Sequence, residues 1–120
     1  MIMPEAVVAI TGASGAQYGV RLVDELLDAG WSISLIVTSA GAINLDLECR
    51  IAPEVLGERD GVTLEDNGNL AARSASGSAR FDAYIVCPAS GTTVGKIAAG
   101  ISDNLATRSA LVALKERRKL

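Results

Sequence analysis

The hydrophobic positions alternate between short continuous runs and runs with helical spacing. The continuous runs, at residues 6–10, 33–37 and 83–87, have the length of strands that are covered on both faces, as in a parallel sheet. After the first run, apolar side chains recur at helical spacing and Gly30 then supplies a left-handed stop; these side chains are Val20, Val23, Leu26 and Leu27. The pattern predicts an α/β fold with a doubly wound, mainly parallel sheet, similar to a Rossmann fold.

Three further helices are predicted. One runs from Ser39 to about Leu47, and another follows the third apolar run and ends at Gly100. Ser102 or Asp103 is expected to cap the last helix, which continues through Leu114. Between residues 49 and 78 the periodicity weakens and Pro and Gly residues interrupt it, so irregular structure is predicted there.

The composition limits the chemistry. A chain of 120 residues fits one domain with its own core, and we expect residues 1–120 to form a single domain. The chain contains no histidine, which excludes a Ser-His-Asp triad, a Cys-His pair and every zinc site that uses histidine. We expect no metal site.

Charge and cysteine usage indicate the partners and the compartment. Residues 1–107 carry six basic against thirteen acidic side chains, whereas residues 108–120 carry five against one. A mostly acidic chain with few aromatic residues is not expected to bind nucleic acid. Cys49 and Cys87 stand far apart and form no CxxC motif, so we expect two thiols in a reducing compartment. No targeting segment and no membrane span is visible, which predicts a cytoplasmic chain.

The turn after the first strand is the first candidate binding site. Gly12-Ala13-Ser14-Gly15 ends a strand and opens a helix, so backbone N–H groups and the helix dipole would point toward one anion. Ser14 and Gln17 stand where the dinucleotide motif requires glycine, and no Walker A lysine follows. A mononucleotide or flavin phosphate suits this turn best. The alternative is a tight turn whose glycines serve packing alone.

The turn after the third strand is the second candidate. Ser90-Gly91-Thr92-Thr93 should face the same crevice as Ser14 and Thr38, because parallel sheets bind ligands beyond the carboxyl ends of their strands. The alternative is that Ser90 only caps a helix. Glu48 and Lys115, taken alone, are expected to be solvated side chains near helix ends.

Three segments in order resemble the UbiX-type flavin prenyltransferases: residues 10–22, residues 87–93, and residues 100–120. These proteins were formerly called aromatic acid decarboxylases. The resemblance implies an enzyme that joins a dimethylallyl group from dimethylallyl phosphate to reduced FMN, without a metal. It also implies that the product, prenylated FMN, serves a UbiD-type decarboxylase, and that the protein forms a trimer-based homo-oligomer.

The resemblance also implies roles for individual residues. Ser14 and Glu48 would take part in the proton movements of ring closure, and Lys115 would bind the phosphate of the prenyl donor. If Thr38 does not make the implied FMN contact, the next residue, Ser39, is the alternative. Residues 76–78 resemble a small-residue loop that lies near the flavin in this family. The implied FMN contacts are Gly12, Ala13, Ser14, Thr38, Ser90, Gly91, Thr92, Thr93 and Arg108.

Members of this family continue beyond the position of Leu120, so we expect residues 1–120 to be a flavin-binding domain truncated at its C-terminal end. Two alternatives therefore stay open. One is an FMN-binding redox or carrier flavoprotein without prenyl transfer. The other is a non-catalytic structural fragment.

Overall fold

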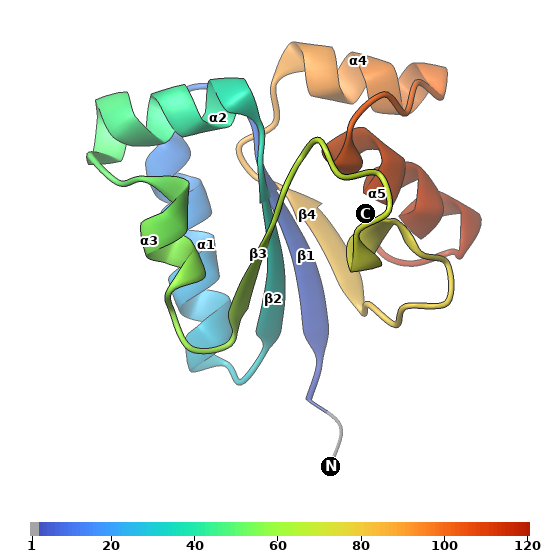
Figure 1. The fold of residues 1–120 in the computed structure, drawn as a ribbon, viewed down its shortest axis with the longest axis horizontal. Helices are drawn as coiled ribbons and strands as arrows, with labels where there is room; N and C mark the ends of the chain where they lie inside the picture. Colours follow the sequence, from blue (N-terminus) through green and yellow to red (C-terminus); the bar gives the residue numbers. More distant parts are fainter. Residues whose placement is uncertain (1–2) are drawn as a thin grey trace.

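The computed structural model describes residues 3–120 and contains a four-stranded parallel sheet (Figure 1). Its strand order is β3-β2-β1-β4, and all three pairs of neighbouring strands are parallel. The strands are β1 (Glu5–Ile10), β2 (Ser32–Val37), β3 (Val62–Glu65) and β4 (Ala83–Val86). The predicted doubly wound α/β fold is confirmed, and the order of the strands reverses between β1 and β4.

Helices cover both faces of the sheet (Figure 1). The helical segments are α1 (Ala16–Asp28), α2 (Ser39–Asn44), a π-helical turn (Leu45–Cys49), α3 (Pro53–Gly57), α4 (Gly91–Ala99) and α5 (Leu105–Lys115). Side chains of α1, the π-helical turn and α3 form one apolar core, and those of α5 form the other, with Ile97 of α4 packed against it. Gly30 has a φ of 88°, which confirms the left-handed stop after α1.

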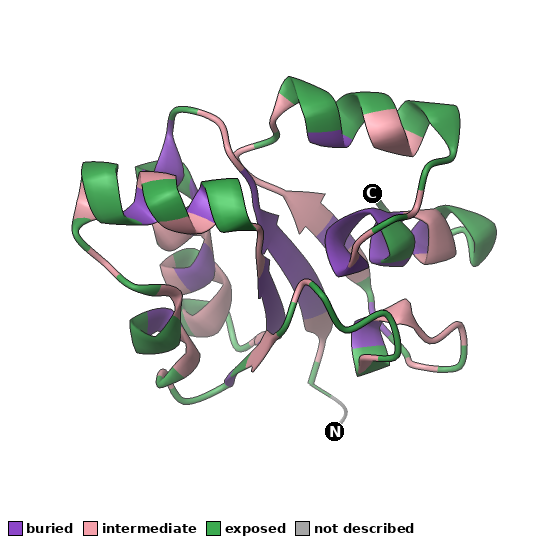
Figure 2. Cartoon of the chain, turned by 45° about the horizontal axis from the view of Figure 1, so that its top comes forward, coloured by how far each residue is buried: buried purple, intermediate pink, exposed green. Residues whose placement is uncertain are grey.

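Successive residues of β1 face the two cores in turn, which explains why residues 6–10 are all apolar. Val7 and Ala9 lie in the core under α5, whereas Val8 and Ile10 lie in the core under α1. Figure 2 shows the central strands buried and the helices exposed on their outer sides. Burial of each large side chain contributes about 1.5–3 kcal/mol, so this strand anchors both layers.

The prediction of irregular structure between residues 49 and 78 is wrong in part. This segment contains α3, the edge strand β3 and a short 3-10 turn, Arg73–Ala75. β3 is only four residues long, and its pairing with β2 places Leu35 opposite Leu64 and Ile36 opposite Glu65. Whether such a short segment forms an edge strand depends on pairing with its neighbour, because its own sequence carries little periodic signal.

The predicted cap of α5 is also wrong. Asn104 caps this helix: its Oδ1 accepts from the Thr107 backbone N–H at 2.9 Å, and the Asn104 N–H donates to the Thr107 hydroxyl at 3.3 Å. Asp103 instead forms an ion pair with Lys96. A one-residue shift of the helix start therefore leaves Asp103 available for a contact with α4.

Lys119 forms an isolated parallel bridge with Ala83 on β4. Among residues 3–120, no helix has both the length and the apolar character needed to cross a bilayer.

Candidate functional site

All four strands point their carboxyl ends toward one cavity of about 340 Å³. Its wall contains residues that follow β1, β2, β3 and β4, and most of them carry hydroxyl or amide groups. The lining residues are Gly12, Thr38, Ser39, Ala40, Asn67, Ser90, Thr92, Thr93, Lys96 and Asn104. The cavity therefore lies where ligands bind in doubly wound sheets, beside the reversal of strand order.

Thr11 ties the turn after β1 to the turn after β4. Its side chain is fully buried, and its hydroxyl donates to the Pro88 carbonyl at 2.6 Å and accepts from the Ser90 N–H at 2.8 Å. The Thr11 N–H donates to the same carbonyl at 3.2 Å. These three hydrogen bonds fix the distance between the two sides of the cavity, and the sequence analysis did not single out this residue.

The hydroxyl groups at two of the strand ends also begin helices. Thr38 accepts from the Gly41 N–H at 3.0 Å and so caps α2, while its own N–H donates to the Ile10 carbonyl. Ser90 caps α4 by accepting from the Thr93 N–H at 3.1 Å and donates to the Thr93 hydroxyl at 2.9 Å. Both residues therefore have a structural role in addition to lining the cavity.

Gly12 has a packing reason that is independent of any ligand. A Cβ atom at this position would lie 2.4 Å from the Cβ of Ala40. The backbone after β1 therefore approaches α2 too closely for a side chain. Close packing of the turn against α2 is therefore sufficient to explain this glycine.

The backbone N–H groups at the start of α1 bind a carboxylate of the same chain, that of Glu48. Oε1 of Glu48 accepts from the backbone N–H groups of Gly15 and Ala16, at 3.0 Å each. A carboxylate at this position satisfies free N–H groups and interacts favourably with the helix dipole. The structure thus brings Glu48 to the turn that contains Ser14, and the Ala13 carbonyl accepts from the Asn44 side chain at 3.1 Å.

Arg108 and Lys115 do not line the cavity. Arg108 is exposed on α5, one turn after Asn104. Lys115 ends the same helix, about 15 Å along its axis from the first residue. Its ammonium group lies 3.4 Å from the carboxylate of Glu116. Within one copy of the chain, the predicted donor-phosphate lysine and the cavity are therefore separated by the length of α5.

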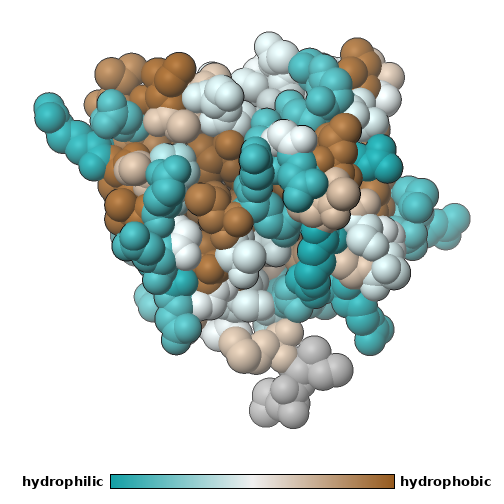
Figure 3. Space-filling model, viewed as in Figure 1, coloured by the Kyte–Doolittle hydropathy of each residue, from teal (hydrophilic) through white to brown (hydrophobic). Residues whose placement is uncertain are grey.

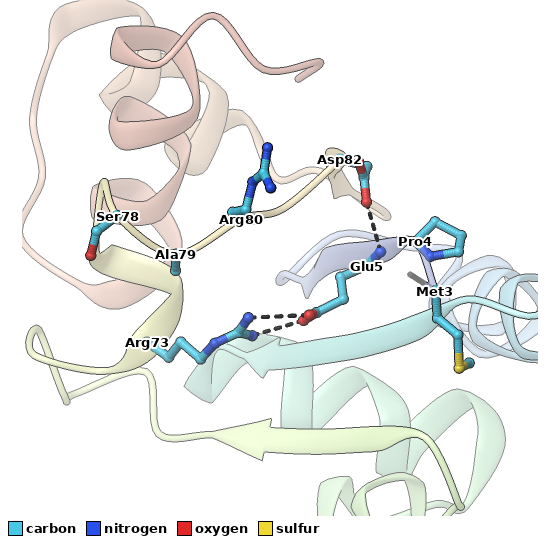
Figure 4. A pocket seen from close by; sticks show the side chains of 8 residues that line it. All are labelled: Met3, Pro4, Glu5, Arg73, Ser78, Ala79, Arg80 and Asp82. Carbon is cyan, nitrogen blue, oxygen red and sulfur yellow. Dashed lines mark hydrogen bonds and ion pairs between the residues drawn. The ribbon is translucent and has the colours of Figure 1, made fainter. Parts of the chain in front are cut away.

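Residues 76–78 lie at the opposite end of the sheet, where the strands begin. Ser78 lines a cavity of about 660 Å³ at the amino ends of β1 and β4 (Figure 4). There Arg73 donates two hydrogen bonds to the Glu5 carboxylate, and Asp82 accepts from the Glu5 N–H. These charged groups are largely paired with one another, which indicates a structural clamp between β1 and the following segments.

Three polar lining residues were missed by the sequence analysis: Asn67, Lys96 and Asn104. Asn67 follows β3, the strand that was not predicted, and accepts from the N–H groups of Leu105 and Ala106 at 2.8 and 3.0 Å. It therefore connects the end of β3 to the start of α5. The signals available in the sequence were the Asp66-Asn67-Gly68 turn and the Asn104 side chain beside the predicted cap.

The two cysteines are free thiols. Cys87 directly follows β4, and partial burial raises the pKa of its thiol above the ordinary value. The raised pKa keeps this thiol protonated at neutral pH, where a protonated thiol is a poor nucleophile. Neither cysteine lines the cavity, whose wall consists mainly of residues with hydroxyl and amide groups.

Comparison with known proteins extends these observations. The family model described as Flavoprotein matches residues 3–120. A curated relative from Halalkalibacterium halodurans, named flavin prenyltransferase UbiX, is 40% identical over 122 residues, which cover 94% of this chain and 59% of that protein. A relative of the same name from Thermoplasma acidophilum is 41% identical, with 95% and 62% covered. The chain thus spans about three fifths of the length of these relatives.

A solved structure supports the same grouping. The crystal structure of AnUbiX in complex with FMN and dimethylallyl pyrophosphate superposes with a TM-score of 0.92 at 32% identity, covering 98% of this chain and 62% of the other. The resemblance to UbiX-type proteins is thereby confirmed over nearly the whole chain. The matches to the family model, the relatives and the fold agree, and the chain belongs to the flavoprotein family.

Proposed function

We propose that the protein containing this chain is a flavin prenyltransferase. It joins the dimethylallyl group of dimethylallyl phosphate to reduced FMN, and its product serves a UbiD-type decarboxylase. The observation that carries the proposal is the meeting of four strand ends at a hydroxyl-lined cavity, next to the turn where Glu48 contacts Gly15. The relatives of similar sequence are named for this activity.

The lining of the cavity has the chemistry that FMN requires. Hydroxyl groups of Ser39 and Thr92 and the amide of Asn67 suit a phosphate or a polyol chain, since they donate and accept hydrogen bonds. Gly91 begins α4, and a Cβ built there would meet nothing within 4 Å, so this helix start is open to a ligand. We assign FMN contacts to Thr38 and to Ser90 through Thr93, with Gly12, Ala13 and Ser14 on the neighbouring turn. The resemblance adds Arg108 on α5, which does not line the cavity of its own copy of the chain. When bound in its reduced form, FMN would supply the electron-rich ring to which the dimethylallyl group is joined.

Glu48 and Ser14 are assigned the proton movements. The two backbone hydrogen bonds go to Oε1 of Glu48, which fixes the carboxylate and leaves Oε2 free to take or give a proton. Ser14 is exposed in the same turn, and its hydroxyl can both donate and accept a hydrogen bond.

Lys115 is assigned to the donor phosphate, and its position at the end of α5 favours a role at the cavity of another copy of the chain. Its exposed ammonium group lies at the far end of α5 from the cavity. A cation there stabilises the negative charge that develops on the departing phosphate. A homo-oligomer, trimer-based as the resemblance implies, would bring this lysine to a neighbouring cavity. A related UbiX-like structure from Escherichia coli, with a TM-score of 0.91 at 34% identity, covers 97% of this chain and 63% of its own, and is dodecameric.

Exposed apolar side chains support assembly. Figure 3 shows hydrophobic atoms gathered on the side of the molecule that carries α2 and α3. The exposed fractions there are 59% for Ile43, 72% for Leu47 and 51% for Val55. Large apolar side chains grouped on a surface are typical of interfaces between subunits.

We place the assembly in the cytoplasm, because both cysteines are free thiols.

A redox or carrier flavoprotein is the second candidate. The observation that favours it is the separation of Lys115 from the cavity, since a carrier needs no donor-phosphate site. The two candidates differ in their response to Lys115→Ala. In a transferase this change weakens donor binding, whereas a carrier binds and releases FMN as before.

The deciding experiment uses the full-length gene product. The protein is incubated anaerobically with FMN, a reductant and dimethylallyl phosphate, and the extracted flavin is analysed by mass spectrometry. The expected result is a gain of one five-carbon unit, lost on Lys115→Ala and retained on Arg21→Ala, a change to an exposed arginine on α1. FMN binding with an unchanged flavin mass would favour the carrier, and absence of FMN binding would contradict both candidates.

A further inference from the structure

Lys96 is the one charged residue in the wall of the cavity at the strand ends, among the residues that the structure describes. It lies on α4, one turn after Thr92, so both side chains belong to the same face of the helix. Its side chain is 30% exposed, and its ammonium group contacts both carboxylate oxygens of Asp103, at 3.1 and 3.0 Å. The cavity therefore has a single cation, held at its rim by a single carboxylate.

The other polar side chains of the wall do not distinguish a phosphate from an alcohol. Hydroxyl and amide groups such as those of Ser39, Thr92 and Asn67 hydrogen-bond to either. An ammonium group does distinguish them, because its attraction to a phosphate dianion is far stronger than to a neutral hydroxyl. Among the side chains of the wall, Lys96 is therefore the one that distinguishes the two ligands by charge, in addition to the open start of α4 at Gly91.

Asp103 is suited to release this lysine. Its side chain is 55% exposed, so the carboxylate regains solvent when the ion pair opens. An ion pair at such an exposed position is weak, whereas a dianion inside the cavity offers twice the charge with less water between the partners. A phosphate therefore displaces Asp103 from Lys96 at little cost.

We propose that Lys96 makes the cavity selective for phosphorylated over unphosphorylated flavin, by exchanging its ion pair with Asp103 for one with the flavin phosphate. The inference rests on the proposed binding of FMN in this cavity. It goes beyond that proposal because it assigns the selection to a residue outside the motifs shared with the UbiX-type proteins, and because it predicts opposite effects for the two members of one ion pair.

The test compares FMN with riboflavin, which differ only in the phosphate. Both are titrated into the full-length protein and its variants, with flavin fluorescence as the readout. Lys96→Met should weaken FMN binding about tenfold or more, as expected for loss of a charged contact, and leave riboflavin binding unchanged. Lys96→Arg should retain most of the preference. Asp103→Asn should strengthen FMN binding, because it removes the competing carboxylate. Arg21→Met is the control that makes the same change in net charge on α1, at an exposed residue outside the cavity wall.

Three results would overturn the inference. Equal loss of FMN and riboflavin binding in Lys96→Met would show a general packing effect. Unchanged FMN binding in both Lys96→Met and Asp103→Asn would show that the ion pair has no part in selection. A loss of dimethylallyl phosphate binding, with FMN binding intact, would assign Lys96 to the donor instead. Failure of the wild-type protein to bind either flavin would contradict the proposed function itself.

Discussion

The backbone N–H of Gly15 donates to the carboxylate of Glu48 at 3.0 Å, although 33 positions separate the two residues in the sequence. The contact joins the turn after β1 to the π-helical turn after α2. It also assigns the free N–H groups at the start of α1 to an internal anion. A ligand phosphate is therefore left to the neighbouring cavity, where Lys96 provides a cation.

Removing this carboxylate should destabilise the fold. Glu48→Ala is expected to lower the free energy of unfolding by about 1–2 kcal/mol, because two N–H groups at a helix start lose their acceptor. Glu48→Gln should cost less, since an amide oxygen still accepts but carries no charge. Urea unfolding measures both. Glu25→Gln, which breaks an exposed pair with Arg21, serves as the control and should change little. Equal stability of Glu48→Ala and the wild type would contradict the capping role.

Loss of the Thr11 hydroxyl should affect both stability and the cavity. Thr11→Val keeps the shape but leaves the Pro88 carbonyl and the Ser90 N–H without this partner, at a cost of about 1–3 kcal/mol. FMN affinity should fall as well, because the turn that contains Ser90 loses its fixed position. Thr11→Ser retains the hydroxyl and should preserve affinity. Chemical unfolding and flavin titration measure the two effects, and a Thr11→Val protein with native affinity would refute the positioning role.

Two glycine replacements should have opposite signs. Gly12→Ala places a Cβ 2.4 Å from that of Ala40 and should destabilise the protein by about 1–3 kcal/mol. Gly95 lies in α4, and a Cβ added there meets nothing within 4 Å. Gly95→Ala should therefore stabilise by about 0.5–1 kcal/mol through helix propensity. Thermal unfolding of the pair checks the prediction, which fails if both changes shift stability in the same direction.

Tyr84 should make stability fall at alkaline pH. Burial is the main cause that raises its pKa, with a further contribution from the charge of Glu65, and its hydroxyl donates to the Ala106 carbonyl. Above a pH of about 10 the unfolded chain loses the tyrosine proton while the folded chain keeps it, so unfolding becomes easier as pH rises. Below that pH the phenol is neutral in both the folded and the unfolded chain, and its full contribution to stability is present. Tyr84→Phe should abolish this part of the pH dependence, and Tyr18→Phe, at an exposed position, should retain it. Urea unfolding between pH 8 and 11 measures the difference, with the pH bounds set by the ordinary tyrosine value of about 10.

The sequence by itself determined the elements with strong local signals. The apolar run of β1 could lie only between two covered faces, and Gly30 and Gly100 set the ends of α1 and α4 through their positive φ angles. The hydroxyl groups of Thr38 and Ser90 were assigned to one crevice because the carboxyl ends of parallel strands lie at the same end of the sheet. Each of these inferences depends on residues that lie close together in the chain.

Only the tertiary structure decided the rest. β3 exists because β2 supplies its hydrogen-bond partners, and Asn67 enters the site with that strand. The contacts of Glu48 with Gly15 and of Lys96 with Asp103 join different elements, and no local pattern encodes them. The separation of Lys115 from the cavity likewise follows from the direction of α5, which packs its buried face on the sheet and carries its last residue away from the strand ends.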